Sequence, residues 1–434
     1  MSADENSGTG GDDGIDVIVV GAGPAGIACA YRLVRAGRSV VLLERGSTAG
    51  SKNVSGGRLY SYALELVEAG LTRQAPWERA VVREQLMFLD ADRSMTLSLA
   101  GTPVPDGGLP ASVTVLRAEF DEWFAGRAEA AGVLLATGIR VDSLLEENGR
   151  IVGIWAGGEQ MRAGTVVAAD GVNSFLAREA GLVGEQSAST VGLGVKETIA
   201  LDAVTIENRF SVAPGEGAAT LMVGCTHGGR GGGFLYTNRD SISLGLVASP
   251  EQIPASGLGI HTMLQNLKAH PGIRPLIEGG RTVEYSAHLV REDGWRGVPK
   301  RLAREGFLVI GEAAGFVLNL GYTVRGMDLA LLSGLAAADA ILAGGDLEPA
   351  YRAALDRCGL SATMKAGAGY ADLLHVQRLY GAYPGLALDV AESLFTVGSR
   401  PPRRLPHQVR AAMRGNQVRL RSLLRDGVVA MRSL

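Results

Sequence analysis

The stretch that decides the fold is IDVIVVGAGPAGIACAYRLVRAGRSVVLLERGSTAGSKNVSGG, residues 15–57. Its apolar run at 15–20 predicts a buried parallel strand, which leads into the pattern G-x-G-x-x-G at 21–26. The first glycine of this pattern permits a sharp turn, the second admits a phosphate, and the third lets the following helix pack on the strand. The N–H groups at the helix start then bind phosphate. The expected phosphate seat comprises Gly21, Gly23, Pro24, Ala25 and Gly26.

A second strand and an acid complete this pattern. The helix is expected to end at Gly37, residues 40–42 form the second strand, and Glu44 follows soon after. A carboxylate in this position holds the ribose hydroxyls of a dinucleotide. Because Glu44 would repel a 2′-phosphate, we expect a ligand with a free ribose, such as FAD or NAD, with Arg45 beside it.

Length and composition indicate a folded protein of two or three domains, because 434 residues with 46% hydrophobic side chains can bury large cores. Residues 1–13 have neither an apolar core nor a basic start, so we expect a disordered tail rather than a signal peptide. The apolar stretch at 327–343 contains Asp328 and Asp339, which disfavours a membrane span. We expect a cytoplasmic protein whose contact with a membrane is at most peripheral.

The net charge of −3 conceals an asymmetry. Residues 400–434 contain nine arginines and one acid, Asp426, whereas residues 1–399 contain 33 basic and 44 acidic residues. We expect this basic C-terminal end to be a solvated helix face packed on the body, with docking of an acidic partner or an anionic membrane as the alternative. No nucleic-acid binding is expected, since the arginines lack interleaved aromatic residues.

Two further segments carry candidate ligand contacts. The polar loop at 50–57 can fold over a bound ligand or serve as a plain surface turn. Arg117 stands where a strand leads into a helix, so it can pair with a diphosphate or form a surface salt bridge. The candidate residues of the loop are Ser51, Asn53, Val54, Ser55 and Gly56.

Two strand ends later in the chain repeat one chemical pattern. The strand at 165–169 is followed by Asp170-Gly171, and the strand at 307–310 is followed by Gly311-Glu312. Acids at the carboxyl ends of parallel strands line a ligand crevice, so these junctions and the phosphate seat predict one extended ligand along the sheet. The chain contains no second complete G-x-G-x-x-G followed by an acid, and we therefore expect no dedicated nicotinamide domain.

The residues leave the catalytic groups unassigned. The six histidines are scattered, and we expect neither a Ser/His/Asp arrangement nor a metal site. The three cysteines, Cys29, Cys225 and Cys358, are too few to hold an iron–sulfur cluster with four cysteines. The chemistry is therefore expected to come from a bound cofactor.

Several segments resemble one class of FAD proteins. The opening motif, the Arg117 junction, VAADG at 167–171 and the Gly311 junction resemble the glutathione-reductase-type FAD fold. Within that class the chain is similar to the FixC family and, more distantly, to the electron-transfer flavoprotein:quinone oxidoreductases, from about residue 15 to 345. The segments that carry this resemblance are GSKNVSG (50–56), VLRAEFD (115–121), GVKE (194–197), GFLYTN (233–238) and NLGYTVRGMD (319–328).

The resemblance implies FAD as cofactor, an electron-transfer flavoprotein as donor, quinone or another small molecule as acceptor, and a separate ferredoxin-like protein as a further partner. Val141 joins the expected cofactor contacts. Gly321, Tyr322 and Thr323 are expected beside the pyrimidine edge of the flavin, because a helix that begins near Thr323 as N-cap would point its positive end there. A plain loop-to-helix cap is the alternative.

The chain departs from the family in two places. It lacks the cysteines of the cluster domain, so any cluster must belong to another protein. It also has Gly311-Glu312 where the family usually has Gly-Asp, and this puts the contact of Glu312 in question. The alternatives to the FixC-like function are an FAD-dependent dehydrogenase, reductase or oxygenase acting on a metabolite, and a flavin-free binding protein.

The predicted fold is α/β, with a Rossmann-type FAD-binding domain, a β-rich substrate domain and a helical C-terminal part. Phe234, Leu235 and Tyr236 can form an apolar entrance for the substrate, although core packing is expected for at least one of them. Proline breaks are expected at Pro384 and 401–402. The expected domains are 14–90, 111–198 and 299–345 (FAD), 91–110 and 199–298 (substrate or quinone), and 346–434 (helical).

Overall fold

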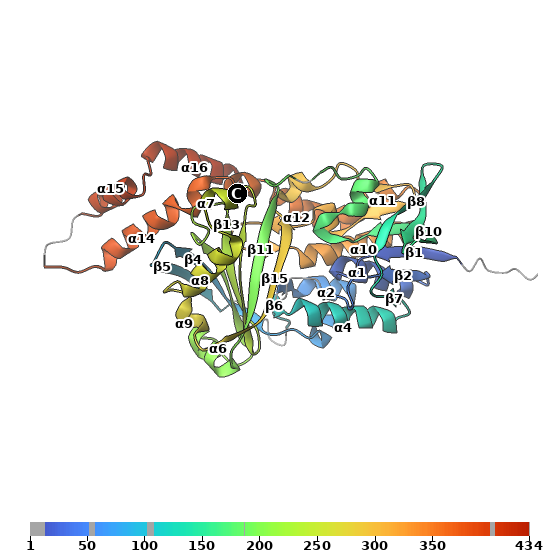
Figure 1. The fold of residues 1–434 in the computed structure, drawn as a ribbon, viewed down its shortest axis with the longest axis horizontal. Coiled ribbons are helices and arrows are strands. Elements are labelled where there is room, and N and C mark those ends of the chain that lie inside the picture. Colours follow the sequence, from blue (N-terminus) through green and yellow to red (C-terminus); the bar gives the residue numbers. More distant parts are fainter. Residues whose placement is uncertain (1–13, 52–56, 102–107, 186, 400–403, 434) are drawn as a thin grey trace, which may run out of the picture.

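The computed structural model describes residues 14–51, 57–101, 108–185, 187–399 and 404–433. Two large β-sheets form separate layers, and the last helices of the chain lie beside the second sheet, away from the first (Figure 1). The α/β fold predicted from the sequence is confirmed.

The first sheet contains the strands of the opening stretch. Its order is β16-β17-β10-β1-β2-β7, and the strands from β17 to β7 are parallel. Central strand β1 is almost entirely buried, which is typical of a parallel strand covered on both faces. The bounds are β1 Ile15–Val20, β2 Val40–Leu43, β7 Leu134–Ala136, β8 Val141–Glu147, β9 Arg150–Ala156, β10 Glu159–Ala168, β16 Ala303–Arg304 and β17 Phe307–Val309.

Three long helices belong to this layer: α1 (Pro24–Arg35), α4 (Arg117–Ala130) and α10 (Met327–Ala343). Helix α1 packs against both α4 and α10. The expectation that a helix begins near Thr323 is wrong, because α10 begins at Met327 with Gly326 as N-cap. Helix α10 is also buried on most of its surface, so its apolar run reflects core packing rather than an amphipathic face.

The second sheet has the order β15-β11-β14-β13-β12-β4-β6-β3, with β5 paired to β4. One face packs on α6 (Ala203–Phe210), α8 (Ile260–Ala269) and α9 (Arg274–Ile277). The expected boundaries place β3, β4, β6 and most of β11 in the FAD part, whereas in the structure these strands pair within this sheet. The bounds are β3 Gly57–Tyr60, β4 Ala80–Leu89, β5 Ser94–Ala100, β6 Ser112–Val115, β11 Val191–Ala200, β12 Glu216–Val223, β13 Gly231–Thr237, β14 Ser241–Ala248 and β15 Arg281–Arg291.

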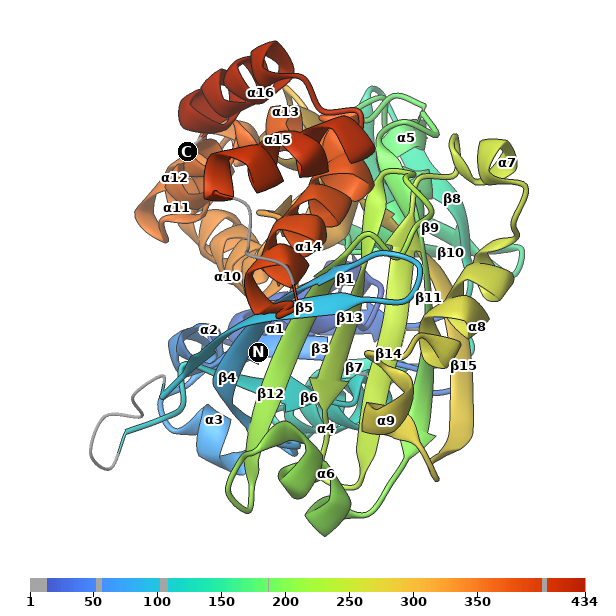
Figure 2. The same ribbon diagram turned by 90° about the vertical axis from the view of Figure 1, so that its left-hand side faces the viewer.

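The C-terminal part is helical, as expected (Figure 2). The break expected at Pro384 is wrong, because Pro384 lies in the first turn of α14, where a missing N–H costs no helical hydrogen bond. No helix among the described residues is both long and apolar enough to cross a bilayer. The bounds are α11 Leu347–Arg357, α12 Leu360–Ala366, α13 Tyr370–Leu374, α14 Ala382–Phe395, α15 Leu405–Gly415 and α16 Leu420–Ser433.

Short elements connect these layers. A two-stranded hairpin, β18 (Leu318–Asn319) and β19 (Val324–Arg325), precedes α10. The remaining helices are α2 Ser61–Val67, α3 Leu71–Gln74, α5 Phe175–Glu179 and α7 Ile253–Ser256, with 3₁₀ turns at Gly171–Asn173, Gly294–Gly297, Gly311–Ala314 and Gln377–Tyr380.

Candidate cofactor-binding site

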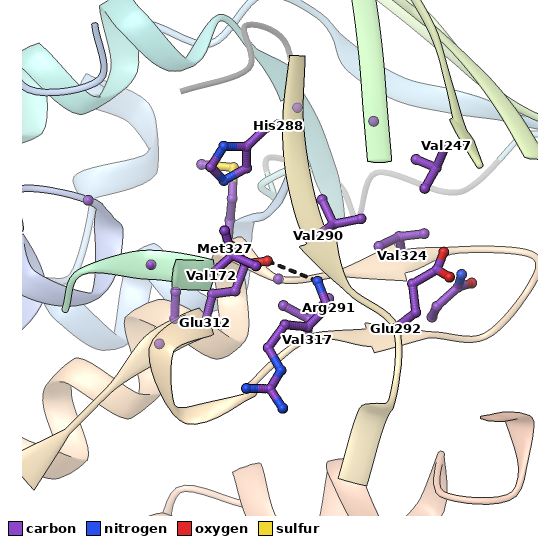
Figure 3. A pocket seen from close by; sticks show the side chains of 18 of the residues that line it. Val172, Val247, His288, Val290, Arg291, Glu292, Glu312, Val317, Val324 and Met327 are labelled. Carbon is purple, nitrogen blue, oxygen red and sulfur yellow. Dashed lines mark hydrogen bonds between the residues drawn. The ribbon is translucent and has the colours of Figure 1, made fainter. Parts of the chain in front are cut away.

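A cavity of about 1240 Å³ lies between the two sheets and extends to the C-terminal helices. It is larger than the roughly 300–1,000 Å³ usual for small-molecule sites, so it has room for a large cofactor together with a second molecule. The cavity is lined by the carboxyl ends of the strands of the first sheet, by β11, β13 and β14 of the second sheet, and by the segment 370–380. Figure 3 shows the part of the wall formed by β15 and the segments opposite it.

The three glycines of the phosphate seat have different environments. Gly21 has φ +109°, and a Cβ there would collide with the carbonyl oxygen of Ala169. A Cβ at Gly26 would collide with the carbonyl oxygen of Gly21. Gly23, by contrast, has no atom within 4 Å of an added Cβ and lines the cavity. Gly21 and Gly26 therefore shape the turn, whereas Gly23 leaves space at the start of α1 for a ligand.

The strand ends predicted to line a crevice are neighbours in space. The N–H of Gly21 donates to Leu43 O at 2.8 Å, and the N–H of Ala169 donates to Val20 O at 2.8 Å. The N–H of Ile310 donates in turn to Ala168 O at 2.9 Å. The carboxyl ends of β1, β2, β10 and β17 therefore form one edge, which is where ligands bind in parallel sheets.

Glu44 is held in place by backbone donors. Its Oε2 accepts from the N–H of Ala22 at 3.0 Å, and its Oε1 accepts from the N–H of Gly46 at 2.5 Å. Glu44 and Arg45 both line the cavity. Since each carboxylate oxygen can accept more than one hydrogen bond, the side chain can still accept from ribose hydroxyls.

Asp170 has an oxygen without a partner. Its Oδ2 accepts from the N–H of Leu176 at 3.2 Å, whereas its buried Oδ1 has no hydrogen-bond partner in the described part of the chain. Burial raises the pKa of this carboxyl group. A buried, unsatisfied oxygen in a cavity wall suits a ligand hydroxyl, and this is the feature that best fits an extended cofactor with a polyol chain.

Glu312 turns toward the second sheet. Its Oε1 accepts from the backbone N–H of Arg291 at 3.2 Å (Figure 3). Burial raises the pKa of Glu312 to about 6, and the charges of Arg117 and Arg291 partly oppose this shift. The longer acid therefore links the first sheet to the end of β15 while it still lines the cavity.

Arg117 combines features of both alternatives drawn from the sequence. It forms a bidentate ion pair with Asp121, with Nε–Oδ1 at 3.0 Å and Nη2–Oδ2 at 2.7 Å. Asp121 is fully buried and Arg117 is 19% exposed, so the pair is not on the outer surface. Because Arg117 also lines the cavity, this ion pair borders the ligand space.

Most of the predicted site residues lie together on the cavity wall. Exceptions are Gly26, which lies within α1 on the face toward Val19 and Ala169, Ser51, whose hydroxyl donates to Thr48 O, and Thr323, whose hydroxyl hydrogen-bonds to Tyr60 at 2.7 Å. Asn53, Val54, Ser55 and Gly56 lie outside the described residues. The predicted residues that line the cavity are Gly21, Gly23, Pro24, Ala25, Glu44, Arg45, Arg117, Val141, Asp170, Gly171, Gly311, Glu312, Gly321 and Tyr322.

Two family profiles match the two ends of the chain, and curated relatives match 96% of it. The profile "FAD dependent oxidoreductase" matches residues 16–111, and the profile "ETF-QO/FixC family C-terminal domain" matches residues 370–434. The chain is 42% identical to a "probable electron transfer flavoprotein-quinone oxidoreductase", YdiS, of Escherichia coli, with 96% of this chain and 98% of the relative covered. It is 40% identical to FixC of Salmonella typhimurium over the same shares. The chain belongs to the ETF-QO/FixC family.

Solved structures confirm the fold of this ETF-QO/FixC family member. A geranylgeranyl bacteriochlorophyll reductase-like protein from Thermoplasma acidophilum superposes with a TM-score of 0.69 at 19% identity, covering 92% of this chain and 95% of that one. The flavin-dependent brominase Bmp2 superposes with a TM-score of 0.63 at 16% identity, covering 93% and 99%. The family member described here is an FAD-dependent oxidoreductase.

Strand β13 separates the three residues expected at the substrate entrance. Phe234 and Tyr236 line the cavity with their rings stacked 5.5 Å apart, whereas Leu235 is fully buried in the core on the other face. This division follows from the alternation of side chains along a strand. The expectation that at least one of the three packs in the core is confirmed.

Several polar residues of the cavity wall are missing from the predicted site, among them Arg230, Glu292 and His375. These three come from three distant parts of the chain, and none of them stands in a motif. The only local signal is the run of three glycines after Arg230, which is unusual for a strand.

Proposed function

We propose that this protein accepts electrons from an electron-transfer flavoprotein and passes them through FAD to a quinone-type acceptor. The observation that carries the proposal is the similarity over 96% of the chain to a relative whose name specifies both partners. The size of the cavity supports it, because the space exceeds what small-molecule sites usually need and could hold a cofactor and an acceptor side by side.

The proposed cofactor contacts follow the edge of the first sheet. The start of α1 and Gly23 would bind the pyrophosphate, Glu44 the adenosine ribose, and the free oxygen of Asp170 a hydroxyl of the cofactor. FAD supplies the two-electron redox chemistry when bound, whereas the chain supplies placement and charge. The ion pair of Arg117 and Asp121 borders this space.

The proposed acceptor region is the apolar part of the cavity wall on the second sheet. Its side chains come from four neighbouring strands, and the stacked rings of Phe234 and Tyr236 offer a flat surface. A flat, largely apolar molecule such as a quinone fits such a wall. The apolar residues are Leu86, Phe88, Leu221, Phe234 and Val247.

The test is an anaerobic titration of the purified holoprotein. We expect a reduced electron-transfer flavoprotein to bleach the flavin absorbance, and a short-chain quinone to restore it. Electron-transfer flavoprotein, NADH, NADPH and a panel of metabolites would be tried in turn as donors. If one metabolite bleaches the flavin and the reduced electron-transfer flavoprotein does not, the proposal is contradicted and direct action on a metabolite is favoured.

A separate ferredoxin-like protein is proposed as an additional partner. The three cysteines of the chain lie in three different elements or loops, and Cys29 is fully buried in the core. A four-cysteine cluster could not be assembled from them. Co-purification of the chain with an iron–sulfur protein would support this partner, and the absence of such a protein from every active preparation would contradict it.

Peripheral contact with a membrane is proposed for helix α16. Leu420, Leu424, Val428 and Met431 recur at helical spacing and are between 41% and 73% exposed, with arginines beside them. Asp426 on the buried side of the helix pairs with Arg378 at 2.7 Å and fixes which face is outward. An apolar face bordered by arginines is typical of a helix that lies in an anionic membrane interface.

The matching experiment is co-sedimentation with vesicles. We expect the double variant Leu424→Glu/Met431→Glu to lose binding to anionic vesicles, and wild-type binding to weaken as salt rises. Val204→Glu changes an equally exposed apolar residue on α6 and serves as control. Unchanged binding of the double variant would exclude this face.

A further inference from the structure

A charged cluster lies in the part of the cavity wall that no sequence motif marks. Arg230 directly precedes β13, Glu292 directly follows β15, and His375 directly follows α13. All three line the cavity that contains the predicted cofactor contacts. The cluster therefore joins the second sheet to the C-terminal part within the site itself.

Arg230 is the centre of this cluster. Its side chain is 9% exposed, and its Nη2 donates to Ser189 O at 2.6 Å. Its Nη1 lies 2.9 Å from His375 Nε2, and its Nε lies 3.5 Å from Glu292 Oε2. A buried guanidinium cannot lose its proton, so the cluster holds a permanent positive charge next to the carboxyl group.

The hydrogen bonds define the state of His375. Its Nδ1 lies 2.6 Å from the carbonyl oxygen of Ala371, which can only accept, so Nδ1 carries the hydrogen. Its Nε2 faces Arg230, which can only donate, so Nε2 accepts. His375 is therefore a neutral ring that fixes the position of the guanidinium.

Glu292 is the member of the cluster with an exchangeable proton. Its side chain is 12% exposed, and burial raises its pKa while the charge of Arg230 opposes this shift. Figure 3 shows Glu292 and Val290 at the end of β15 and beyond it. The other titratable groups that bear on Glu292 are Asp293 and Tyr380, whose hydroxyl donates to Leu374 O at 2.6 Å.

The two other candidates on this wall suit proton donation less well. The carboxylate of Glu312 is engaged by the backbone N–H of Arg291. Burial and the charge of Arg117 lower the pKa of His288, which favours a neutral ring that is a poor acid. Glu292 differs from Glu312 because its carboxyl group lies beside the guanidinium of Arg230 and is not engaged by the backbone N–H of Arg291.

We propose that Glu292 is the acid that protonates the acceptor in this cavity, and that Arg230 and His375 are its positioning residues. This inference rests on the proposed function. A quinone-type acceptor gains two electrons from the reduced cofactor and two protons, so that its two C=O groups become C–OH groups. Bound reduced FAD would supply the two electrons and two protons. Glu292 gives its proton to one oxygen of the acceptor and takes up one of these two protons, and the other proton goes to the second oxygen. The charge of Arg230 stabilises the negative charge that develops on that oxygen.

The test compares two acceptors in anaerobic single-turnover reoxidation of the reduced holoprotein. A short-chain quinone needs protons, whereas ferricenium takes one electron and needs none. We expect Glu292→Gln to slow the reaction with quinone about 10²-fold and to leave the reaction with ferricenium unchanged. Glu292→Asp should recover part of the quinone rate. Glu197→Gln, which removes a buried carboxylate from the opposite face of the same sheet, should leave both rates unchanged.

The pH dependence tests the positioning residues. The wild-type quinone rate should fall as pH rises through the pKa of Glu292, and this fall should vanish in Glu292→Gln. Because Arg230 lowers the pKa of Glu292, Arg230→Gln should move the midpoint to higher pH, and Arg230→Lys should restore it. Retained flavin absorbance and an unchanged ferricenium rate would show that these variants are folded.

The outcomes separate this inference from the function on which it rests. A Glu292→Gln variant that keeps the quinone rate, or loses both rates equally, overturns the assignment of the acid alone. A wild-type protein that reacts with ferricenium and never with quinone overturns the proposed function, and the assignment with it.

Discussion

The phosphate seat and the Arg230–Glu292–His375 cluster line the same cavity but are built in opposite ways. The seat comes from one continuous stretch, and the contacts proposed there for a ligand are backbone N–H groups arranged by glycines. The cluster is assembled from three segments that are distant in the sequence, and its contacts are charged side chains. A local motif reveals the first region, whereas only the folded structure reveals the second.

This difference predicts different sensitivities to substitution. At Gly21 and Gly26 of the phosphate seat a single added methyl group should be decisive, because backbone atoms leave no space for it. In the rest of the cavity wall, shape should matter less and charge or hydrogen bonding more.

Gly21→Ala is expected to have the largest effect. The added Cβ would collide with the backbone of Ala169, at a φ of +109° that side chains rarely adopt. Overpacking and backbone strain together should destabilise the protein by about 2–4 kcal/mol. Urea denaturation and the flavin content of purified protein would measure this loss.

Gly23→Val is the matched control in the same seat. No atom lies within 4 Å of an added Cβ at Gly23, so stability should be retained. The side chain would instead occupy the space at the start of α1, and FAD binding should be abolished. Stoichiometric FAD with unchanged affinity in this variant would mean that the pyrophosphate lies elsewhere.

The parts of the fold that the sequence predicts well are those with local causes. Strand β1, helix α1 and strand β2 follow from apolar periodicity and glycine spacing. The junctions at Asp170 and Gly311 could also be predicted, because an acid and a glycine follow an apolar run in both places. Their proximity then follows from the geometry of a parallel sheet.

The parts that could not be predicted depend on contacts distant in sequence. Strand β4 pairs with β12, which lies more than a hundred residues later in the chain, and no local sequence feature predicts this pairing. Thr323 has the residue type of an N-cap, but it lies in the hairpin of β18 and β19 and its hydroxyl hydrogen-bonds to Tyr60, 263 residues earlier in the sequence. A glutamate such as Glu292 is expected on the surface, but in the folded structure its side chain is only 12% exposed.

Glu312→Gln should have the next largest effect, and it should depend on pH. The pKa of Glu312 is raised to about 6 from 4.5, so the folded state holds this proton more tightly than the unfolded state. Wild-type stability should therefore decrease as pH rises from 4.5 to 6. Above pH 6 the glutamine variant should be more stable by about 2 kcal/mol, because it keeps the acceptor for Arg291 without the charge.

Urea denaturation of flavin-free protein across pH 4 to 8 would measure this difference. Both proteins should have similar stability at pH 4, where the carboxyl group is protonated in both states. A constant difference at every pH would mean that the buried charge is not the cause.

Glu44→Gln should weaken FAD binding more modestly. The carboxylate accepts from the N–H groups of Ala22 and Gly46, and the amide of glutamine can keep only one of these acceptors. Loss of one charge-assisted hydrogen bond corresponds to about 1.5 kcal/mol, or roughly tenfold in affinity. Titration of flavin-free protein with FAD would measure it. An unchanged affinity would indicate that Glu44 supports the loop and does not contact the ribose.

Tyr60→Phe should have the smallest effect. It tests the contact between strand β3 of the second sheet and the β18–β19 hairpin. The hydroxyl of Tyr60, at the end of β3, hydrogen-bonds to Thr323 Oγ1 at 2.7 Å, which ties the β18–β19 hairpin to the second sheet. Phenylalanine keeps the ring that lies under Arg58 and Arg325, so only the hydrogen bond is lost, at about 1 kcal/mol. A double-mutant cycle with Thr323→Val, followed by urea denaturation, would isolate this energy. If the effects of the two substitutions on the free energy of unfolding are additive, Tyr60 and Thr323 do not stabilise each other. The position of the hairpin would then depend on its own backbone and not on a contact distant in sequence.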